Sequence, residues 1–157
     1  MERRVDASEH NILIVRDNLA SSYDECGRLE EALSLRQDVY SRRLKFLGEE
    51  HISTLRAANN HAITLSELQR FEEAKRVLRK TMPVARRVLG AEHELTLSIR
   101  EDLSCATLDG DSSSKEKRKA LQTLDDTVAV MRRVKGPAHP DTLHAQEKLE
   151  GYRGGSH

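Results

Sequence analysis

The sequence repeats itself, and this constrains the possible fold more than any other feature. The motif Leu-Gly-x-x-His-x-x-Thr-Leu occurs twice and returns a third time as Lys-Gly-Pro-Ala-His-Pro-Asp-Thr-Leu. Its glycine stands at Gly48, Gly90 and Gly136, so the second copy follows the first by 42 residues and the third follows the second by 46. A period of this length indicates stacked supersecondary units, because one unit alone cannot bury its apolar face.

Each unit divides into two predicted helices, here named A and B in chain order, because apolar residues recur at the spacing of one helix face. Gly48 and Gly90 follow the B helices, where a C-cap favours glycine, and Thr54 is placed to cap a helix A. Pro83 lies inside the second B helix, where its missing N–H predicts a kink or an end. The expected A helices cover residues 8–25, 51–68 and 94–108, the B helices 29–47, 71–88 and 115–135, and a last helix 140–151.

These segments together resemble the tetratricopeptide repeat. The repeated motif, Asn59-Asn60-His61-Ala62 and the stretch Arg-Phe-Glu-Glu-Ala at 70–74 are similar to the 42-residue version found in kinesin light chains and kinesin-light-chain-like proteins. The resemblance covers residues 8–150. It implies an all-α, right-handed superhelical solenoid of three helix–turn–helix repeats plus a C-terminal capping helix, with partner segments bound on the concave face of the A helices.

The expected repeat domain is residues 8–151, after a lead-in at 1–7 and before a disordered tail or tag remnant at 152–157. Its repeats are expected at about 8–50, 51–92 and 93–138, with the capping helix at 139–151.

The resemblance also implies a peptide-binding groove. In many family members an Asn of helix A bonds the ligand backbone or a terminal carboxylate, and the matching positions here are Asn18 and Asn60. The third repeat has Asp102 instead, which would repel a carboxylate. The residues expected on or near the groove are Asp17, Asn18, Ser21, Asp24, Arg56, Asn59, Asn60, Ile63, Glu67, Glu101, Asp102 and Cys105.

Charge is sorted between the helices, although the chain has 26 Lys and Arg, 26 Asp and Glu and no net charge. The A helices of the first and third repeats are acidic, and the B helices of the second and third are basic. This predicts an acidic groove and a basic convex surface, which would favour a basic ligand. The alternative is that these are ordinary solvated faces with pairs between charges four residues apart.

Other kinds of site are not expected. His51, His93 and His139 recur once per repeat, too far apart to share a metal ion, and are predicted to bond backbone in the turns. Cys105 has no His nearby in sequence to form a nucleophile pair, and Gly110 lacks the glycine partners of a phosphate loop. We therefore predict no enzyme activity, metal or cofactor.

The sequence predicts a protein–protein interaction scaffold that binds a peptide or partner segment. Neither nucleic acid nor a membrane is an expected partner, because the net charge is zero and no apolar run approaches the roughly 20 residues of a bilayer span. Two cysteines and no signal peptide predict a cytoplasmic protein. Two alternatives stay open: a self-associating module, since a short array has exposed apolar ends, and the regulatory or cargo-binding portion of a larger motor or enzyme.

Overall fold

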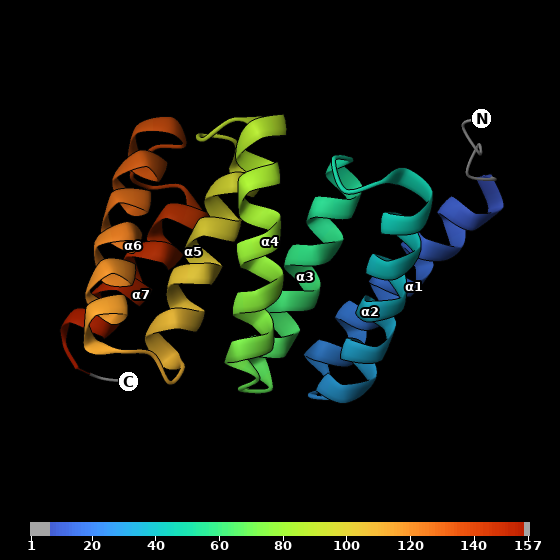
Figure 1. Cartoon of the computed structure of the whole chain (residues 1–157), viewed down its shortest axis with the longest axis horizontal. Coiled ribbons are helices and arrows are strands. Elements are labelled where there is room, and N and C mark those ends of the chain that lie inside the picture. Colours follow the sequence, from blue (N-terminus) through green and yellow to red (C-terminus); the bar gives the residue numbers. More distant parts are fainter. Residues whose placement is uncertain (1–6, 156–157) are drawn as a thin grey trace.

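The chain is described by a computed structural model that covers residues 7–155. Over this range it forms an all-α solenoid, as predicted, and each predicted helix is present with both ends within two residues of the expected ones (Figure 1). The helices are α1 (Ala7–Glu25), α2 (Leu29–Leu47), α3 (Ile52–Glu67), α4 (Phe71–Leu89), α5 (Glu94–Asp109), α6 (Ser114–Val134) and α7 (Pro140–Arg153).

Successive helices pack against one another along the whole array. Figure 1 shows α2, α4 and α6 as one layer, with the A helices α1, α3, α5 and α7 as the other. Besides its chain neighbours, α3 also contacts α5, so the A helices of adjacent repeats touch directly. The inner layer of the solenoid is therefore a surface made by several helices side by side.

The core is thickest in the middle of the array and thinnest at α1. Leu65, Leu78 and Ile99 are fully buried in a large cluster shared by α3, α4 and α5. A second cluster around Leu97 and Leu124 joins α5, α6 and α7. By contrast, the cluster that reaches α1 is small and has as its buried members Leu13, Val39 and Ala57.

Each repeat motif forms a turn in which glycine and histidine have separate roles. Gly48, Gly90 and Gly136 have φ of 82°, 96° and 99°, which confirms the C-cap prediction, because this left-handed region favours glycine. The histidine three residues later caps the next helix. In each turn its Nδ1 accepts a hydrogen bond from a backbone N–H, and the three bonds are His51–Ser53 at 3.1 Å, His93–Leu95 at 3.1 Å and His139–Asp141 at 3.2 Å.

The prediction that these histidines bond backbone is therefore confirmed, whereas the capping role expected for Thr54 is wrong. Thr54 is buried with 2% of its surface exposed, and Thr96 and Thr142 are fully buried at the equivalent positions. Their side chains pack between helices because they lie one turn inside, on the core-facing side.

Two helices continue past positions at which the sequence indicated a break or an end. α4 continues through Pro83 to Leu89, so the proline does not end it. Pro83 is exposed, and the buried residues Leu78 and Ala85 on either side hold the helix against its neighbours. α7 reaches Arg153, so Tyr152 is helical and not part of a tail. The other domain limits stay predictions, and residues 1–6 and 156–157 lie outside the described range.

None of the helices in the described range is both long and apolar enough to cross a bilayer.

Candidate functional site: a groove between α3, α5 and α7

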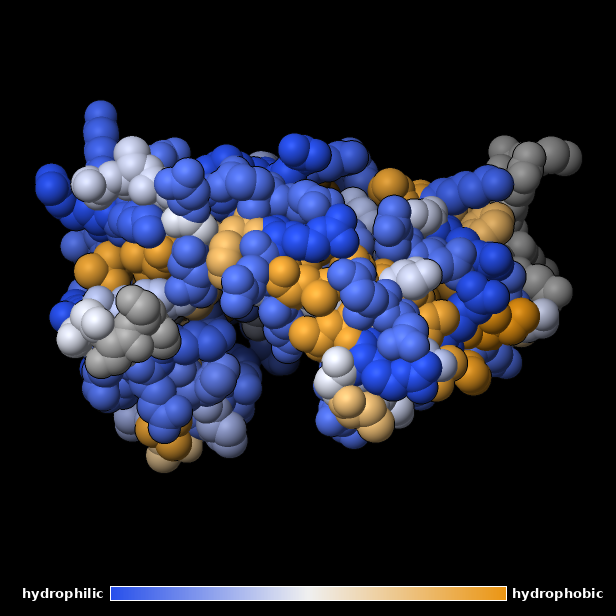
Figure 2. Space-filling model, turned by 90° about the horizontal axis from the view of Figure 1, so that it is seen from below, coloured by the Kyte–Doolittle hydropathy of each residue, from blue (hydrophilic) through white to orange (hydrophobic). Residues whose placement is uncertain are grey.

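The concave side of the solenoid contains a cavity of about 810 Å³. Its walls are the inward faces of α3, α5 and α7, whose lining residues recur at three- to four-residue spacing. Figure 2 shows the concave side from below as a hollow between two lobes. A space of this size falls in the range of ligand-binding pockets.

Most of the predicted groove residues lie together in this cavity. Those that line it are Arg56, Asn59, Asn60, Ile63, Glu67, Glu101, Asp102 and Cys105. The four on α1 do not line it: Asp17, Asn18, Ser21 and Asp24. Two of these instead form ion pairs with α2, where Asp17 meets Arg43 and Asp24 meets Arg36. The first repeat thus directs its carboxylates at its own helix B.

The fourth helix of the inner layer, α7, supplies a wall that the sequence analysis missed by treating it only as a cap. Its lining residues are Asp141, His144, Lys148 and Tyr152. The repeat register could have found them. Lys148 follows Asp102 by 46 residues and Asp102 follows Asn60 by 42, so Lys148 occupies the same position of its repeat as Asn18, Asn60 and Asp102.

The lining of the cavity is predominantly acidic. Six carboxylates line it, and they are Glu67, Glu94, Glu101, Asp102, Asp109 and Asp141. Two side chains that carry a full positive charge, Arg56 and Lys148, oppose them. Exposed cations gather instead on the B helices, and those of α4 are Arg76, Arg79, Lys80, Arg86 and Arg87. The two layers therefore differ in charge in the direction that the sequence predicts.

Two polar contacts join α5 to α7 beside the cavity. Lys148 Nζ donates to Glu101 Oε1 at 2.9 Å, and Tyr152 OH donates to Asp109 Oδ2 at 2.9 Å. Burial lowers the pKa of Lys148, but the carboxylate of Glu101 and other neighbours outweigh it, so the net shift is upward. Lys148 is therefore firmly cationic and offsets part of the acidic lining.

Among the carboxyl groups that line the cavity, Asp102 has the most strongly shifted pKa. Burial, with the charge of Glu101 beside it, raises the pKa of Asp102 to about 7, against smaller opposing effects of Lys148 and a hydrogen bond with Asn59. Asn59 is buried at 5% exposure, and its Oδ1 has no hydrogen-bond partner within the described residues. The charge of the cavity consequently changes near neutral pH.

Cys105 is unsuited to nucleophilic chemistry. Burial raises the pKa of its thiol to about 12, so it is protonated at neutral pH, whereas the thiolate is the reactive form. Both cysteines of the chain are free thiols, with Cys26 exposed and Cys105 half-buried.

Comparison with known proteins identifies the repeat and the fold. Residues 11–87 match the family model described as tetratricopeptide repeat. The solved structure of a Podosopora anserina protein, described as "kinesin light chain nearly identical TPR-like repeats", is 24% identical with a TM-score of 0.78 over 89% of this chain. A second structure, of a substituted form of that protein, gives the same values. BtubC (BKLC) from P. vanneervenii is 18% identical, with a TM-score of 0.61, and the match covers 98% of this chain and 67% of that one.

The chain spans 64% of the length of the Podosopora anserina structures, and at these identities the likeness establishes the fold alone. Among curated proteins, none matches the sequence.

Proposed function

Because the chain is a tetratricopeptide repeat protein of the 42-residue, kinesin-light-chain-like type, we propose that it is a protein-binding scaffold that holds a partner segment between α3, α5 and α7. We propose further that this segment presents Lys or Arg side chains to the cavity. Tetratricopeptide repeats generally mediate protein–protein interaction, and the charge of the cavity supports the finer part of the proposal.

The observation that carries the proposal is the excess of carboxylates around the cavity. Four of the six, Glu67, Glu94, Asp102 and Asp109, form no ion pair with any residue of the described range. Partial burial raises the pKa of Glu67, with a further contribution from Asp24 that Arg36 opposes, although the residue as a whole is exposed to the solvent of the groove. A ligand cation would compensate these charges, and the same field would attract basic segments and repel acidic ones.

The polar side chains of α3 supply the second part of the argument. Asn60 lines the cavity at the position where the family resemblance expects a contact with the ligand backbone. A neutral amide can donate to and accept from a peptide group, and it does not depend on the ligand's side chains. Asn60 would then hold an extended segment while the carboxylates select its charge.

We propose no catalytic step for this site. Its one thiol, Cys105, is kept protonated by burial, and the remaining polar groups are carboxylates, amides and cations suited to recognition. The scaffold function therefore rests on binding alone.

The test compares two labelled peptides of equal length, one rich in Lys and Arg and one rich in Asp and Glu, by fluorescence anisotropy. We expect the basic peptide to bind more tightly and to lose affinity as salt rises from 50 to about 500 mM, because salt screens the attraction. Glu67→Gln and Glu94→Gln should each weaken it several-fold. Glu147→Gln, on the exposed side of α7, is the matched control and should leave affinity unchanged.

Asn60→Ala separates the two parts of the proposal. Loss of one hydrogen bond of about 1 kcal/mol should weaken binding of the basic peptide roughly five-fold without changing its salt dependence. Equal affinity for the acidic and basic peptides would contradict the charge assignment. Unchanged affinity of Asn60→Ala together with Glu67→Gln would move the binding site elsewhere on the molecule.

A further inference from the structure

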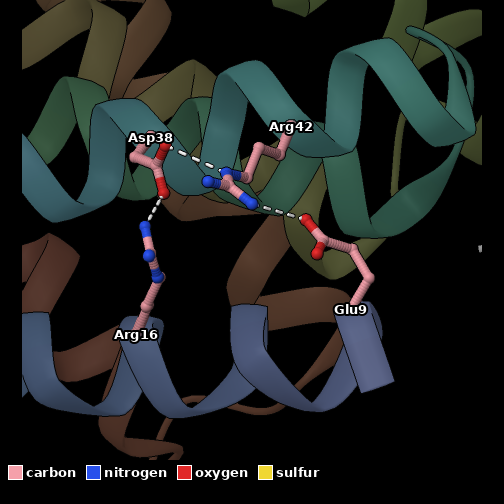
Figure 3. Close-up of polar contacts among 4 residues, drawn as sticks. All are labelled: Glu9, Arg16, Asp38 and Arg42. Carbon is pink, nitrogen blue, oxygen red and sulfur yellow. Dashed lines mark hydrogen bonds and ion pairs between the residues drawn. The ribbon is translucent and has the colours of Figure 1, made fainter. Parts of the chain in front are cut away.

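Helix α1 directs its charges toward α2. Four of its charged residues pair with α2, and the pairs are Glu9–Arg42, Arg16–Asp38, Asp17–Arg43 and Asp24–Arg36. Figure 3 shows how Arg42 bridges Glu9 of α1 and Asp38 of its own helix, while Arg16 reaches the same Asp38 from α1. Arg42 lies 2.8 Å from Glu9 and 3.1 Å from Asp38. Polar contacts thus supply much of the α1–α2 interface.

Another face of α1, which does not meet α2, is apolar and exposed. Ile12, Val15 and Leu19 fall on one stripe by their spacing of three and four residues, and they are 42%, 64% and 42% exposed. Ile14 is 40% exposed but lies on another side of the helix. Hydrophobic surface is visible at the end of the molecule where α1 lies (Figure 2). A surface helix normally has the reverse arrangement, with its apolar stripe toward the core and its charges in water.

The packing of α1 differs from that of the A helices α3 and α5 within the described residues. Both α3 and α5 are enclosed between two B helices, α3 by α2 and α4, and α5 by α4 and α6. Within residues 7–155, α1 has such a neighbour on one side, namely α2. Exposed apolar side chains that lie together on one stripe are a feature of protein interaction sites.

The other end of the solenoid does not fit this face. The exposed side of α7 carries Leu143, but Glu147 and Glu150 follow it on the same face at spacings of four and three residues. Stacking the copies end to end would bury these two carboxylates against Ile12, Val15 and Leu19, and an unpaired buried charge is costly. The cost of burying these two carboxylates disfavours end-to-end stacking of copies.

A second α1 does fit it. The stripe carries no charge, and it is symmetric in chemistry, with a large aliphatic residue on each side of Val15. An antiparallel pair of α1 helices around a two-fold axis near Val15 places Ile12 of one copy against Leu19 of the other. The exposed amides of Asn11 and Asn18 would border the same contact. We infer that the outer face of α1 is a homodimer interface, in which two copies pair antiparallel through Ile12, Val15 and Leu19.

Light scattering coupled to size exclusion, over a range of protein concentrations, tests the interface. We expect a dimer mass that dissociates on dilution, and Val15→Glu should raise the dissociation constant at least ten-fold by placing two carboxylates at the axis. Val88→Glu is the control, because Val88 is also an exposed valine, 41% exposed, on α4. A monomer at every concentration, or a dimer that Val15→Glu leaves unchanged, would overturn the inference.

Disulfide trapping tests the orientation. Val15→Cys in a Cys26→Ser background should form a reducible dimer on mild oxidation, since the axis brings the two positions within disulfide range. In the antiparallel pair the two Cys26 residues would lie about 33 Å apart, so the wild-type chain should not cross-link there. A Cys26–Cys26 disulfide in the wild type would refute the antiparallel arrangement. Val15→Glu should keep the wild-type affinity for the basic peptide, which separates this interface from the proposed groove function.

Discussion

Lys148 Nζ lies 2.9 Å from Glu101 Oε1, so a cation from α7 meets a carboxylate from α5 beside the cavity. The Glu101 side chain is 10% exposed and the Lys148 side chain 32% exposed, which makes this pair a half-buried link between two helices. The pair has two consequences, because it anchors α7 and also uses one of the carboxylates that a basic ligand would otherwise meet.

Lys148→Met should therefore bind a basic peptide several-fold more tightly, because the Glu101 carboxylate is released and a repelling cation is removed. The free energy of unfolding should fall by about 1 kcal/mol, as for a partly exposed ion pair. Anisotropy titration and urea denaturation measure the two effects. Lys119→Met, at an exposed position of α6, should change neither. Weaker peptide binding by Lys148→Met would show that the lysine contacts the ligand favourably.

Asp102→Asn should change how stability depends on pH. In the folded protein the pKa of Asp102 is raised to about 7, from 3.8. The folded state thus binds this proton more tightly than the unfolded chain, and the contribution of Asp102 to stability is lost as pH rises from about 4 to 7. The variant should be more stable than the wild type at pH 8. Its free energy of unfolding, measured by urea denaturation, should not show the decrease between pH 4 and 7 that is due to Asp102. Parallel pH profiles for the two proteins would show that Asp102 ionises normally.

The same ionisation should control ligand binding. Between pH 6 and 8 Asp102 gains its negative charge, so the affinity for a Lys- and Arg-rich peptide should rise several-fold over this range. The Asp102→Asn variant should show a flatter profile, measured by anisotropy at constant ionic strength. If the variant keeps the full rise, another group is responsible for it.

His61→Leu should reduce the loss of stability that the protein undergoes in mild acid. His61 is 9% exposed beside the Tyr40 ring, and burial, with the charge of Arg70, lowers its pKa below 6.5. The unfolded chain takes up this proton first, so stability is lost as pH falls below about 6.5. Leucine stands at the equivalent positions 19 and 103. The melting temperature of the variant should fall less between pH 7.5 and 5.5, whereas the exposed-site control His10→Gln should behave like the wild type.

Arg36→Met should be the most destabilising of these changes. The Arg36 guanidinium is buried, pairs with Asp24 and donates to Thr64 and to the backbone oxygen of Asn60. Its loss leaves a partly buried carboxylate and two acceptors without their donor, at a cost of about 3 kcal/mol in urea unfolding. Arg28→Met breaks the exposed pair with Glu31 and is the matched control, for which we expect little change. A small effect at Arg36 would mean that water replaces its contacts.

The helices and turns of this protein could be predicted from the sequence because they depend on local and repeated features. Apolar spacing locates each helix, and the recurring glycine and histidine mark each turn, so the helix ends agree to within two residues. The repeat spacing also predicts which residue of α7 faces inward, since Lys148 continues the series of Asn18, Asn60 and Asp102. Most of the groove lining on α3 and α5 follows from the same register.

Tertiary packing decided which way each face points and how each charge behaves. Asp17 and Asp24 occupy groove positions by register, yet both pair with α2, because the rotation of α1 about its axis depends on the surface against which it packs. The raised pKa of Asp102 likewise depends on burial, and Lys148, 46 residues away in the chain, opposes the shift. Periodicity is a property of the chain itself, whereas desolvation and charge pairing arise only when distant helices meet.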